Sequence, residues 1–258
     1  MIVSLIQFAP VLGGLEHNRA LISEFLDEAK DADLAVLPEL AFTGYNFAGP
    51  EMARTLSEVP TESASLELLH KKAIQNDQHI ICGFNERAGD VLFNSTVLVG
   101  PEGLLGIYRK MHLFMKEKNI FEPGNSNLDV FDIGCCKLGM QICFDYLFPE
   151  PWRILAQRGA ELIIHPSNLL TQNATKSLPG IALRNKIFTL TANRIGTEGN
   201  LLFNGNSMII DPAGDIILRA SADNTEIISM KIDPSLAHNK MITEMNHVFD
   251  DRRPEQYI

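Results

Sequence analysis

The chain has 258 residues, with 32 acidic and 22 basic side chains and a formal net charge of −10. This length suits one large α/β domain with a substantial core. No cluster of Lys and Arg is longer than a pair, which argues against a nucleic-acid-binding protein because phosphate contacts need clustered cations. No apolar run is long enough to cross a bilayer, so we expect neither a nucleic-acid partner nor a membrane partner.

The cysteines bear on the cellular compartment. Cys82, Cys135, Cys136 and Cys143 include no Cys-x-x-Cys pair, and two of them are adjacent, which is poor geometry for a disulfide. The first residues show no basic segment followed by an apolar leader. We therefore expect four reduced thiols in a cytoplasmic protein.

Short apolar runs alternate with longer amphipathic segments through the first half of the chain. The apolar runs predict strands at residues 2–8, 34–37, 79–85, 94–99 and 104–110. An apolar stripe that includes Ile22 and Leu26 predicts a helix over residues 15–29. Thr61 is expected to cap a second helix that runs to about Asn76.

The second half repeats this order. Ala32-Asp33-Leu34 with Pro38 is matched by Ala160-Glu161-Leu162 with Pro166, and Asn94-Ser95 before a Pro-x-Gly turn is matched by Asn206-Ser207 before another. The two Pro-x-Gly pieces, which begin at Pro101 and Pro212, predict turns between antiparallel strands. Residues 138–143 then correspond to the first strand, and residues 149–159 to the first helix.

Two similar halves with fully apolar strands predict two sheets that pack face to face, with helices on both outer faces. The expected fold class is therefore α/β, as a four-layer α-β-β-α sandwich, and we expect residues 1–258 to form a single domain. Residues 115–127 predict a loop. Residues 233–258 predict a short helix followed by a tail that is either disordered or docked on a partner subunit.

Three reactive side chains stand where predicted strands end: Glu39, Lys110 and Cys143. A thiol needs a base or a nearby positive charge before it attacks carbon. Glu39 can be that base if burial raises its pKa. Lys110 would favour the thiolate and then stabilise a tetrahedral intermediate, with the backbone N–H of Phe144 as a second donor.

Each of these residues also has an ordinary structural explanation. A buried cysteine is usually inert, and a charge at a strand end is usually solvated. A Cys–His hydrolase, with Cys143 activated by His112 or His165, is an alternative in which Lys110 is dispensable. The seven histidines include no pair at helical spacing, so we expect no metal site.

Three stretches, Leu37–Tyr45, Tyr108–Phe114 and Gly139–Asp145, resemble motifs of the nitrilase superfamily of carbon–nitrogen hydrolases. Other segments are similar too, so that the resemblance covers nearly the whole chain: residues 121–125, 165–168, 192–196 and 252–254. The resemblance implies a Glu–Lys–Cys site on the sandwich described above. Glu39 would be the general base, Lys110 the charged stabiliser and Cys143 the nucleophile.

The resemblance also implies a second glutamate in the loop after the lysine. Glu117 is the matching residue, with Glu122 as the alternative. Tyr45 follows the glutamate motif, and Asn168 ends the second half's counterpart of the Glu39 strand. We expect Tyr45, Asn168 and Phe144 to contact the substrate.

The mechanism that the resemblance implies is covalent. The thiolate attacks an amide, carbamoyl or nitrile carbon, ammonia or an amine leaves, and water activated by Glu39 hydrolyses the thioester without a metal or organic cofactor. Small-molecule amides are the commonest substrates of such enzymes, so we expect an amidase. A nitrilase acting on small aliphatic mononitriles or dinitriles and an N-carbamoyl hydrolase are the enzymatic alternatives.

Two further expectations follow from the resemblance. Family members usually pair through elements that include the C-terminus, so we expect a homodimer or a higher homo-oligomer. A catalytically silent binding protein, with the loop around Glu117 as a partner surface, is the non-enzymatic alternative. The intact set of Glu39, Lys110 and Cys143 argues against it.

Overall fold

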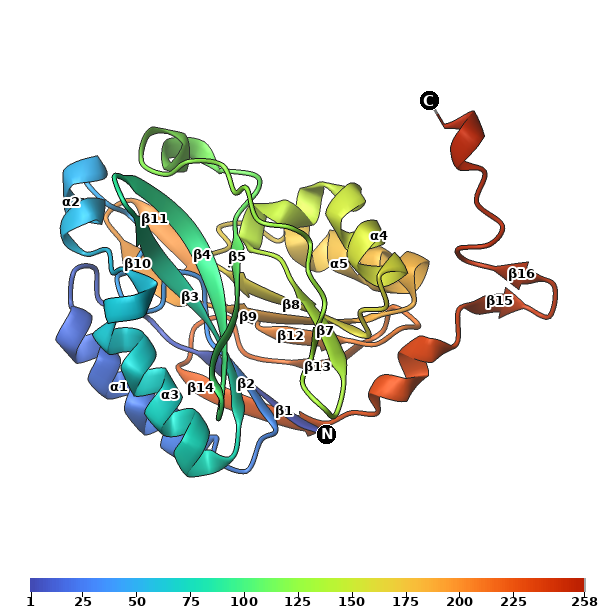
Figure 1. Cartoon of the computed structure of the whole chain (residues 1–258), viewed down its shortest axis with the longest axis horizontal. Helices are drawn as coiled ribbons and strands as arrows, with labels where there is room; N and C mark the ends of the chain where they lie inside the picture. Colours follow the sequence, from blue (N-terminus) through green and yellow to red (C-terminus); the bar gives the residue numbers. More distant parts are fainter. Residues whose placement is uncertain (258) are drawn as a thin grey trace.

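The computed structural model describes residues 1–257 and contains two six-stranded sheets (Figure 1). The first sheet has the order β14-β1-β2-β3-β4-β5, and the second has the order β13-β12-β9-β8-β7-β6. The strands of the first are β1 (Ile2–Gln7), β2 (Leu34–Val36), β3 (His79–Ala88), β4 (Val91–Gly100), β5 (Gly103–Arg109) and β14 (Glu226–Lys231). Those of the second are β6 (Phe131–Asp132), β7 (Lys137–Met140), β8 (Leu162–Ser167), β9 (Phe188–Asn193), β12 (Met208–Ile210) and β13 (Ile216–Arg219).

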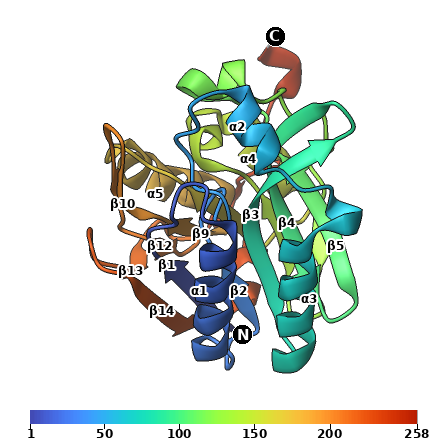
Figure 2. The same ribbon diagram turned by 90° about the vertical axis from the view of Figure 1, so that its left-hand side faces the viewer.

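Helices cover the two outer faces. Helices α1 (Leu15–Glu28) and α3 (Ala64–Asn76) lie side by side against the first sheet (Figure 2). Helices α4 (Pro149–Gln157) and α5 (Asn173–Asn185) cover the second sheet from the opposite side (Figure 1). The short helix α2 (Pro50–Thr55) lies at one end of the first sheet. The expected α-β-β-α sandwich is confirmed.

Alternation along the strands separates the core into layers. Val3 and Leu5 of β1 belong to a cluster that also contains Leu138 of β7 and extends to the buried faces of α4 and α5. Ile6 points the other way and joins Leu26 of α1 in a second cluster under the helices. Because both faces of β1 are covered, its apolar run shows no polar alternation.

The internal repeat predicted from the sequence is visible in the topology. Strands β1, β2 and β3 run parallel, as do β7, β8 and β9. Each set continues into an antiparallel hairpin, β4–β5 in one half and β12–β13 in the other. The predicted Pro-x-Gly turns join these hairpin strands. Gly103 (φ +109°) and Gly214 (φ +88°) adopt backbone angles that favour glycine in such turns.

Some local predictions were wrong. Ser63, not Thr61, caps α3, because its side chain accepts a hydrogen bond from the N–H of Leu66, while residues 60–62 form the separate 3-10 turn η1 (Pro60–Glu62). The predicted loop after Lys110 contains a 3-10 helix, η2 (Met115–Asn119). The strand before Cys143 stops at Met140.

The C-terminal segment is more structured than a helix and a tail. It contains η4 (Pro234–His238), a small hairpin of β15 (Met241–Thr243) and β16 (Asn246–His247), and η5 (Pro254–Gln256). The segment projects from the body beyond α4 and α5 (Figure 1). Among residues 1–257, no helix has the length and apolar character needed to span a membrane.

Candidate active site

Glu39 lies in a turn that crosses directly over β3. The backbone N–H of Gly83 donates to the carbonyl oxygen of Pro38 (3.0 Å), and Ala41 N–H donates to the carbonyl of Gly83 (3.3 Å). A Cβ atom on Gly83 would stand 2.4 Å from Glu39 Cα, so only glycine fits there. Leu40 takes a positive φ of 50°, which turns the chain sharply after the carboxylate.

Lys110 follows β5 immediately, and its backbone is held on both sides. Its N–H donates to the carbonyl of Asn94 (2.8 Å), and its own carbonyl accepts from Gly124 N–H (2.8 Å). A Cβ atom on Gly124 would stand 2.0 Å from the Arg109 carbonyl oxygen. The loop after η2 therefore packs tightly onto the strand end that carries the lysine.

The ammonium group of Lys110 joins two carboxylates in the interior. Lys110 Nζ donates to Glu39 Oε1 (2.7 Å) and to Glu117 Oε1 (2.8 Å), and the side chains of the three residues are at most 4% exposed. Asn94 Nδ2 also donates to Glu39 Oε1 (2.7 Å). Glu39 Oε2 has no hydrogen-bond partner among residues 1–257, so one acidic oxygen is left to act on another group.

Cys143 begins the 3-10 helix η3 (Cys143–Leu147) with a positive φ of 43°. A non-glycine residue in this region is strained, and such strain is common at functional sites. Asp145 fixes the turn, because its buried Oδ2 accepts from the N–H of Ile142 (3.0 Å) and from the hydroxyl of Tyr108 (2.8 Å). The contact with Tyr108 ties this turn to β5, the strand that leads into Lys110.

The electrostatics of the cluster favour a protonated thiol at rest. Burial and then the charge of Glu39 raise the pKa of the Cys143 thiol well above its usual value, and the opposing effect of Lys110 is smaller. Burial also raises the pKa of Glu39, against the Lys110 ammonium. Burial lowers the pKa of Lys110, but the negative charges of Glu117 and Glu39 together exceed this effect and raise that pKa well above its usual value. With two carboxylates around one ammonium, the site tolerates a thiolate only if a proton moves to a neighbouring group.

The two histidines of the alternative Cys–His site have other partners. His165 Nε2 donates to the backbone carbonyl of Cys143 (2.8 Å), and burial lowers the pKa of His165 to about 4. His112 pairs with Asp145 Oδ1 through Nδ1 (2.7 Å) and stacks on the ring of Phe148 at 3.6 Å. Both rings are thus placed to support the turn around Cys143, and within residues 1–257 neither forms a hydrogen bond with the thiol.

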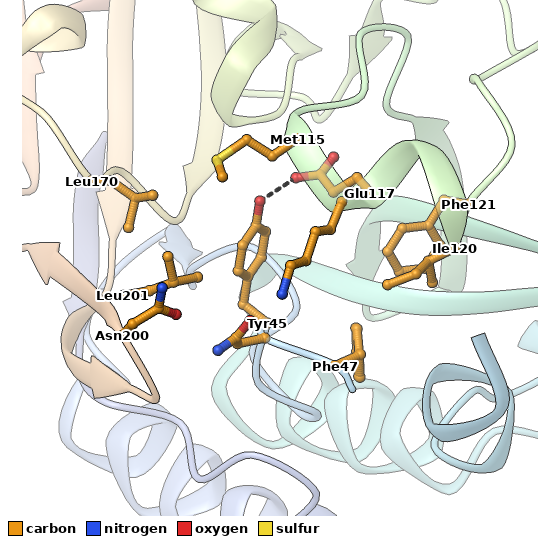
Figure 3. Close-up of a pocket in the computed structure, with 11 residues that line it drawn as sticks. Tyr45, Phe47, Met115, Glu117, Ile120, Phe121, Leu170, Asn200 and Leu201 are labelled. Carbon is orange, nitrogen blue, oxygen red and sulfur yellow. Dashed lines mark hydrogen bonds between the residues drawn. The ribbon is translucent and has the colours of Figure 1, made fainter. Parts of the chain in front are cut away.

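A pocket opens beside Glu117. Tyr45 donates its hydroxyl hydrogen to Glu117 Oε1 (2.6 Å), and both residues line this pocket (Figure 3). Asn168 does not line it, but its Nδ2 donates to the backbone carbonyl of Glu39 (3.0 Å), at the sheet edge predicted from the repeat. The Phe144 side chain lines a different groove, with His112. Glu122 is exposed, and its N–H donates to the Leu92 carbonyl (2.9 Å), so Glu117 is the glutamate that meets Lys110.

Sequence reasoning missed three residues of this network. Asn94 was noticed only as part of the repeat, although it contacts Glu39. Glu198 ends β10 (Ile195–Glu198) and accepts from the N–H groups of Tyr45 (3.0 Å) and Asn46 (2.7 Å). Arg194 forms a buried ion pair with Glu198. For Arg194 the signal was the similarity of residues 192–196 to a family motif, and that stretch stops before Glu198.

Comparison with known proteins identifies the family. The carbon–nitrogen hydrolase family model matches residues 2–239. The chain belongs to this family, within the nitrilase superfamily. The hydrolase is 41% identical to a nitrilase of Pyrococcus abyssi, over 99% of this chain and 98% of that protein. It is 31% identical to an (R)-stereoselective amidase of a Pseudomonas species, over 90% and 86%.

The solved structures agree with the sequences. An amidase from a Nesterenkonia species superimposes on the hydrolase with a TM-score of 0.82 at 25% identity, covering 93% of this chain and 92% of that one. The hydrolase is therefore an enzyme of the class that cleaves carbon–nitrogen bonds other than peptide bonds. Family membership also argues against the non-enzymatic alternative, in which the chain is a catalytically silent binding protein.

Proposed function

We propose that the hydrolase is an amidase that cleaves small-molecule carboxamides through a thioester on Cys143. The observation that carries this proposal is the shared ammonium of Lys110, which holds Glu39 and Glu117 and leaves Glu39 Oε2 without a partner. The amidases among the relatives and solved structures support the substrate class.

The chemistry follows from the positions of the groups. As the sulfur of Cys143 attacks the amide carbon, its proton moves to Glu39 Oε2 and the carbonyl oxygen becomes an oxyanion. Lys110 and the N–H of Phe144 stabilise that oxyanion, and this N–H donates no hydrogen bond within residues 1–257. Glu39 then gives the proton to the nitrogen, so that the C–N bond breaks and ammonia or an amine leaves.

The second half of the reaction uses the same groups in reverse. Glu39 takes a proton from water, the hydroxide attacks the thioester carbon, and the C–S bond breaks to restore the thiol and release the acid. Glu117 does not take the proton in this scheme. It orients Lys110 and is itself held by the hydroxyl of Tyr45.

A nitrilase is the second candidate, and one observation favours it: the Pyrococcus abyssi relative at 41% identity is named a nitrilase. Attack of Cys143 on a nitrile carbon would give a thioimidate, which water converts to the same acid and ammonia. N-carbamoyl hydrolysis is a third use of the same groups, as in the N-carbamoylputrescine amidase of Arabidopsis thaliana, which is 28% identical.

A substrate panel tests the proposal. Small amides, N-carbamoyl amino acids, mononitriles and dinitriles are assayed for released ammonia, with the Cys143→Ala variant as the control. We expect amides to be hydrolysed with a higher kcat/KM than the nitriles of the same acyl chain. A higher kcat/KM for the nitriles would make the enzyme a nitrilase, and ammonia release that persists in the variant would remove Cys143 from the mechanism.

We also propose that residues 1–258 act as one hydrolase domain and that the chain forms a homodimer in which the C-terminal segment docks on the partner. Met241, Ile242, Met245 and Tyr257 in this segment are between 40% and 89% exposed, and exposed apolar side chains of this kind often belong to protein–protein interfaces. Sedimentation equilibrium of the intact chain at micromolar concentration should give a dimer mass, and a monomer mass would contradict the proposal. The cytoplasmic location stays a prediction.

A further inference from the structure

The pocket beside Glu117 has a wall that is mostly apolar. Segments from both halves of the chain meet there: the turn after β2, helix η2, the loop after β8, and the start of β11 (Leu201–Asn204). The apolar lining residues, labelled in Figure 3, are Phe47, Met115, Ile120, Phe121, Leu170 and Leu201. The remaining lining residues are Tyr45, Asn46, Lys116, Glu117 and Asn200. Of these, Tyr45 and Glu117 belong to the network that holds Lys110.

The pocket wall has two charged side chains: Glu117 is buried and already paired, and Lys116 is solvated. Glu117 Oε1 accepts from Tyr45 and Lys110, and Glu117 Oε2 accepts from the N–H of Phe114 (3.1 Å). The other charged lining residue, Lys116, is exposed to solvent. Among the described lining residues, no buried charge is left to pair with a charged substrate group, and burying an unpaired charge is costly.

The wall near Leu201 is held firmly. Glu198, at the end of the neighbouring strand β10, accepts from the backbone of Tyr45 and Asn46, and Asn46 Nδ2 donates back to the Glu198 carbonyl (3.0 Å). Arg194 neutralises Glu198 and lies 4.2 Å from the ring centroid of Phe203 in β11. The β10–β11 hairpin and the turn that carries Tyr45 are therefore joined into one support for the pocket.

From this wall we infer the substrate class: the hydrolase acts on carboxamides with an apolar, uncharged acyl chain, and Leu201 contacts that chain. The inference rests on the proposed function, because it places the acyl side of the scissile amide in this pocket. The overall reaction is then RCONH₂ + H₂O → RCOO⁻ + NH₄⁺, in which R is a short aliphatic or aryl group. Amides whose chain ends in a carboxylate or an ammonium are disfavoured.

The first arm of the test measures turnover. The wild-type enzyme is assayed with acetamide, propionamide and butyramide, and with two charged amides, succinamate and 4-aminobutyramide. We expect kcat/KM to rise about threefold for each added methylene, as apolar burial predicts. The charged amides should fall about tenfold or more below butyramide. A higher kcat/KM for either charged amide would overturn the inference while leaving the amidase proposal intact.

The second arm measures binding without chemistry. Calorimetric titration of the Cys143→Ala variant with butyramide and with succinamate reports the preference of the pocket even if the wild-type enzyme releases no ammonia from amides. Tighter binding of butyramide with no turnover would support the apolar pocket and refute the amidase proposal. Tighter binding of succinamate, reduced by a further Lys116→Ala change, would show an anion site and overturn the inference.

A matched pair of variants tests the contact with Leu201. Leu202, its neighbour in β11, is 68% exposed and does not line the pocket. We expect Leu201→Asp to lower kcat/KM for butyramide about tenfold and to change that for acetamide much less. Leu202→Asp should leave both values unchanged. Equal effects of Leu201→Asp on both amides, or a similar loss in Leu202→Asp, would overturn the assignment of Leu201.

Discussion

Replacing Lys110 with methionine should lower the free energy of unfolding by about 3–5 kcal/mol, which is the usual result when one partner of a buried ion pair is removed. The methionine roughly preserves the volume of the lysine stem. What it removes is the ammonium that both Glu39 and Glu117 contact within 2.8 Å. Both carboxylates are left buried without a cation, so the cost is electrostatic and not a loss of packing.

The pH dependence of this variant has a definite sign. Lys110 lowers the pKa of Glu39 against the effect of burial, so its removal raises that pKa further. A carboxyl group whose pKa is raised in the folded state binds more protons there than in the unfolded chain, and stability then falls as the pH rises. The difference between wild type and Lys110→Met should therefore be larger at pH 8 than at pH 5.

Urea unfolding at the two pH values measures this effect. Lys118→Met is the matched control, because Lys118 lies in η2 next to Glu117, is exposed, and makes no ion pair within the described residues. Its effect should stay within about 0.5 kcal/mol. A Lys110→Met variant as stable as the wild type at both pH values would show that the ammonium is not the charge that balances these carboxylates.

Replacing Cys143 with alanine should abolish hydrolysis, with kcat/KM reduced roughly 10⁴-fold or more, as for other enzymes that lose a covalent nucleophile. Cys143→Ser should be nearly as inactive, because a serine hydroxyl is far harder for Glu39 to deprotonate than a thiol. Both variants should keep the wild-type fold, since the turn is held by Asp145 and His165.

The control for this prediction is Cys135→Ala. Cys135 is an exposed free thiol in the turn between β6 and β7, so its removal should leave kcat/KM unchanged. Normal activity in Cys143→Ala would instead assign the nucleophile to another group.

The activity of the wild-type enzyme should also depend on pH. Glu39 must be ionised to accept the thiol proton, and burial raises the pKa of Glu39. As the pH is lowered, activity should therefore be lost at a higher pH than it would be with a glutamate of ordinary pKa.

The sequence predicted the parts of the fold that depend on local patterns. Apolar runs located the strands, and Pro-x-Gly located the hairpin turns at Pro101 and Pro212, because a turn is specified by residues adjacent in the chain. The cap of α3 was predicted wrongly, since Ser63 and Thr61 are both suitable capping residues. The strands of the β15–β16 hairpin are largely exposed, so they have no apolar alternation from which they could be predicted.

For the candidate site, the positions of individual residues could be predicted from the sequence, but the contacts between them could not. Strand ends gave the positions of Glu39 and Lys110, but not their contact, which joins residues 71 apart in the sequence. The hydrogen bond between Asn94 and Glu39 spans 55 positions, and the one between Tyr45 and Glu198 spans 153. No spacing rule within one sequence reveals such contacts. The positive φ of Cys143 could not be predicted either, because the residue type gives no indication of it.

The covalent role of Cys143 is tested most directly by trapping the acyl-enzyme. The enzyme is mixed with p-nitrophenyl butyrate, an activated ester with which we expect thioester hydrolysis to be the slower step. The reaction is quenched in acid within the first turnover and mapped by peptide mass spectrometry. The account predicts one butyryl group per chain, on the peptide that carries Cys143, and none in the Cys143→Ala variant. A butyryl group on any other residue that forms and decays at the rate of turnover would contradict it.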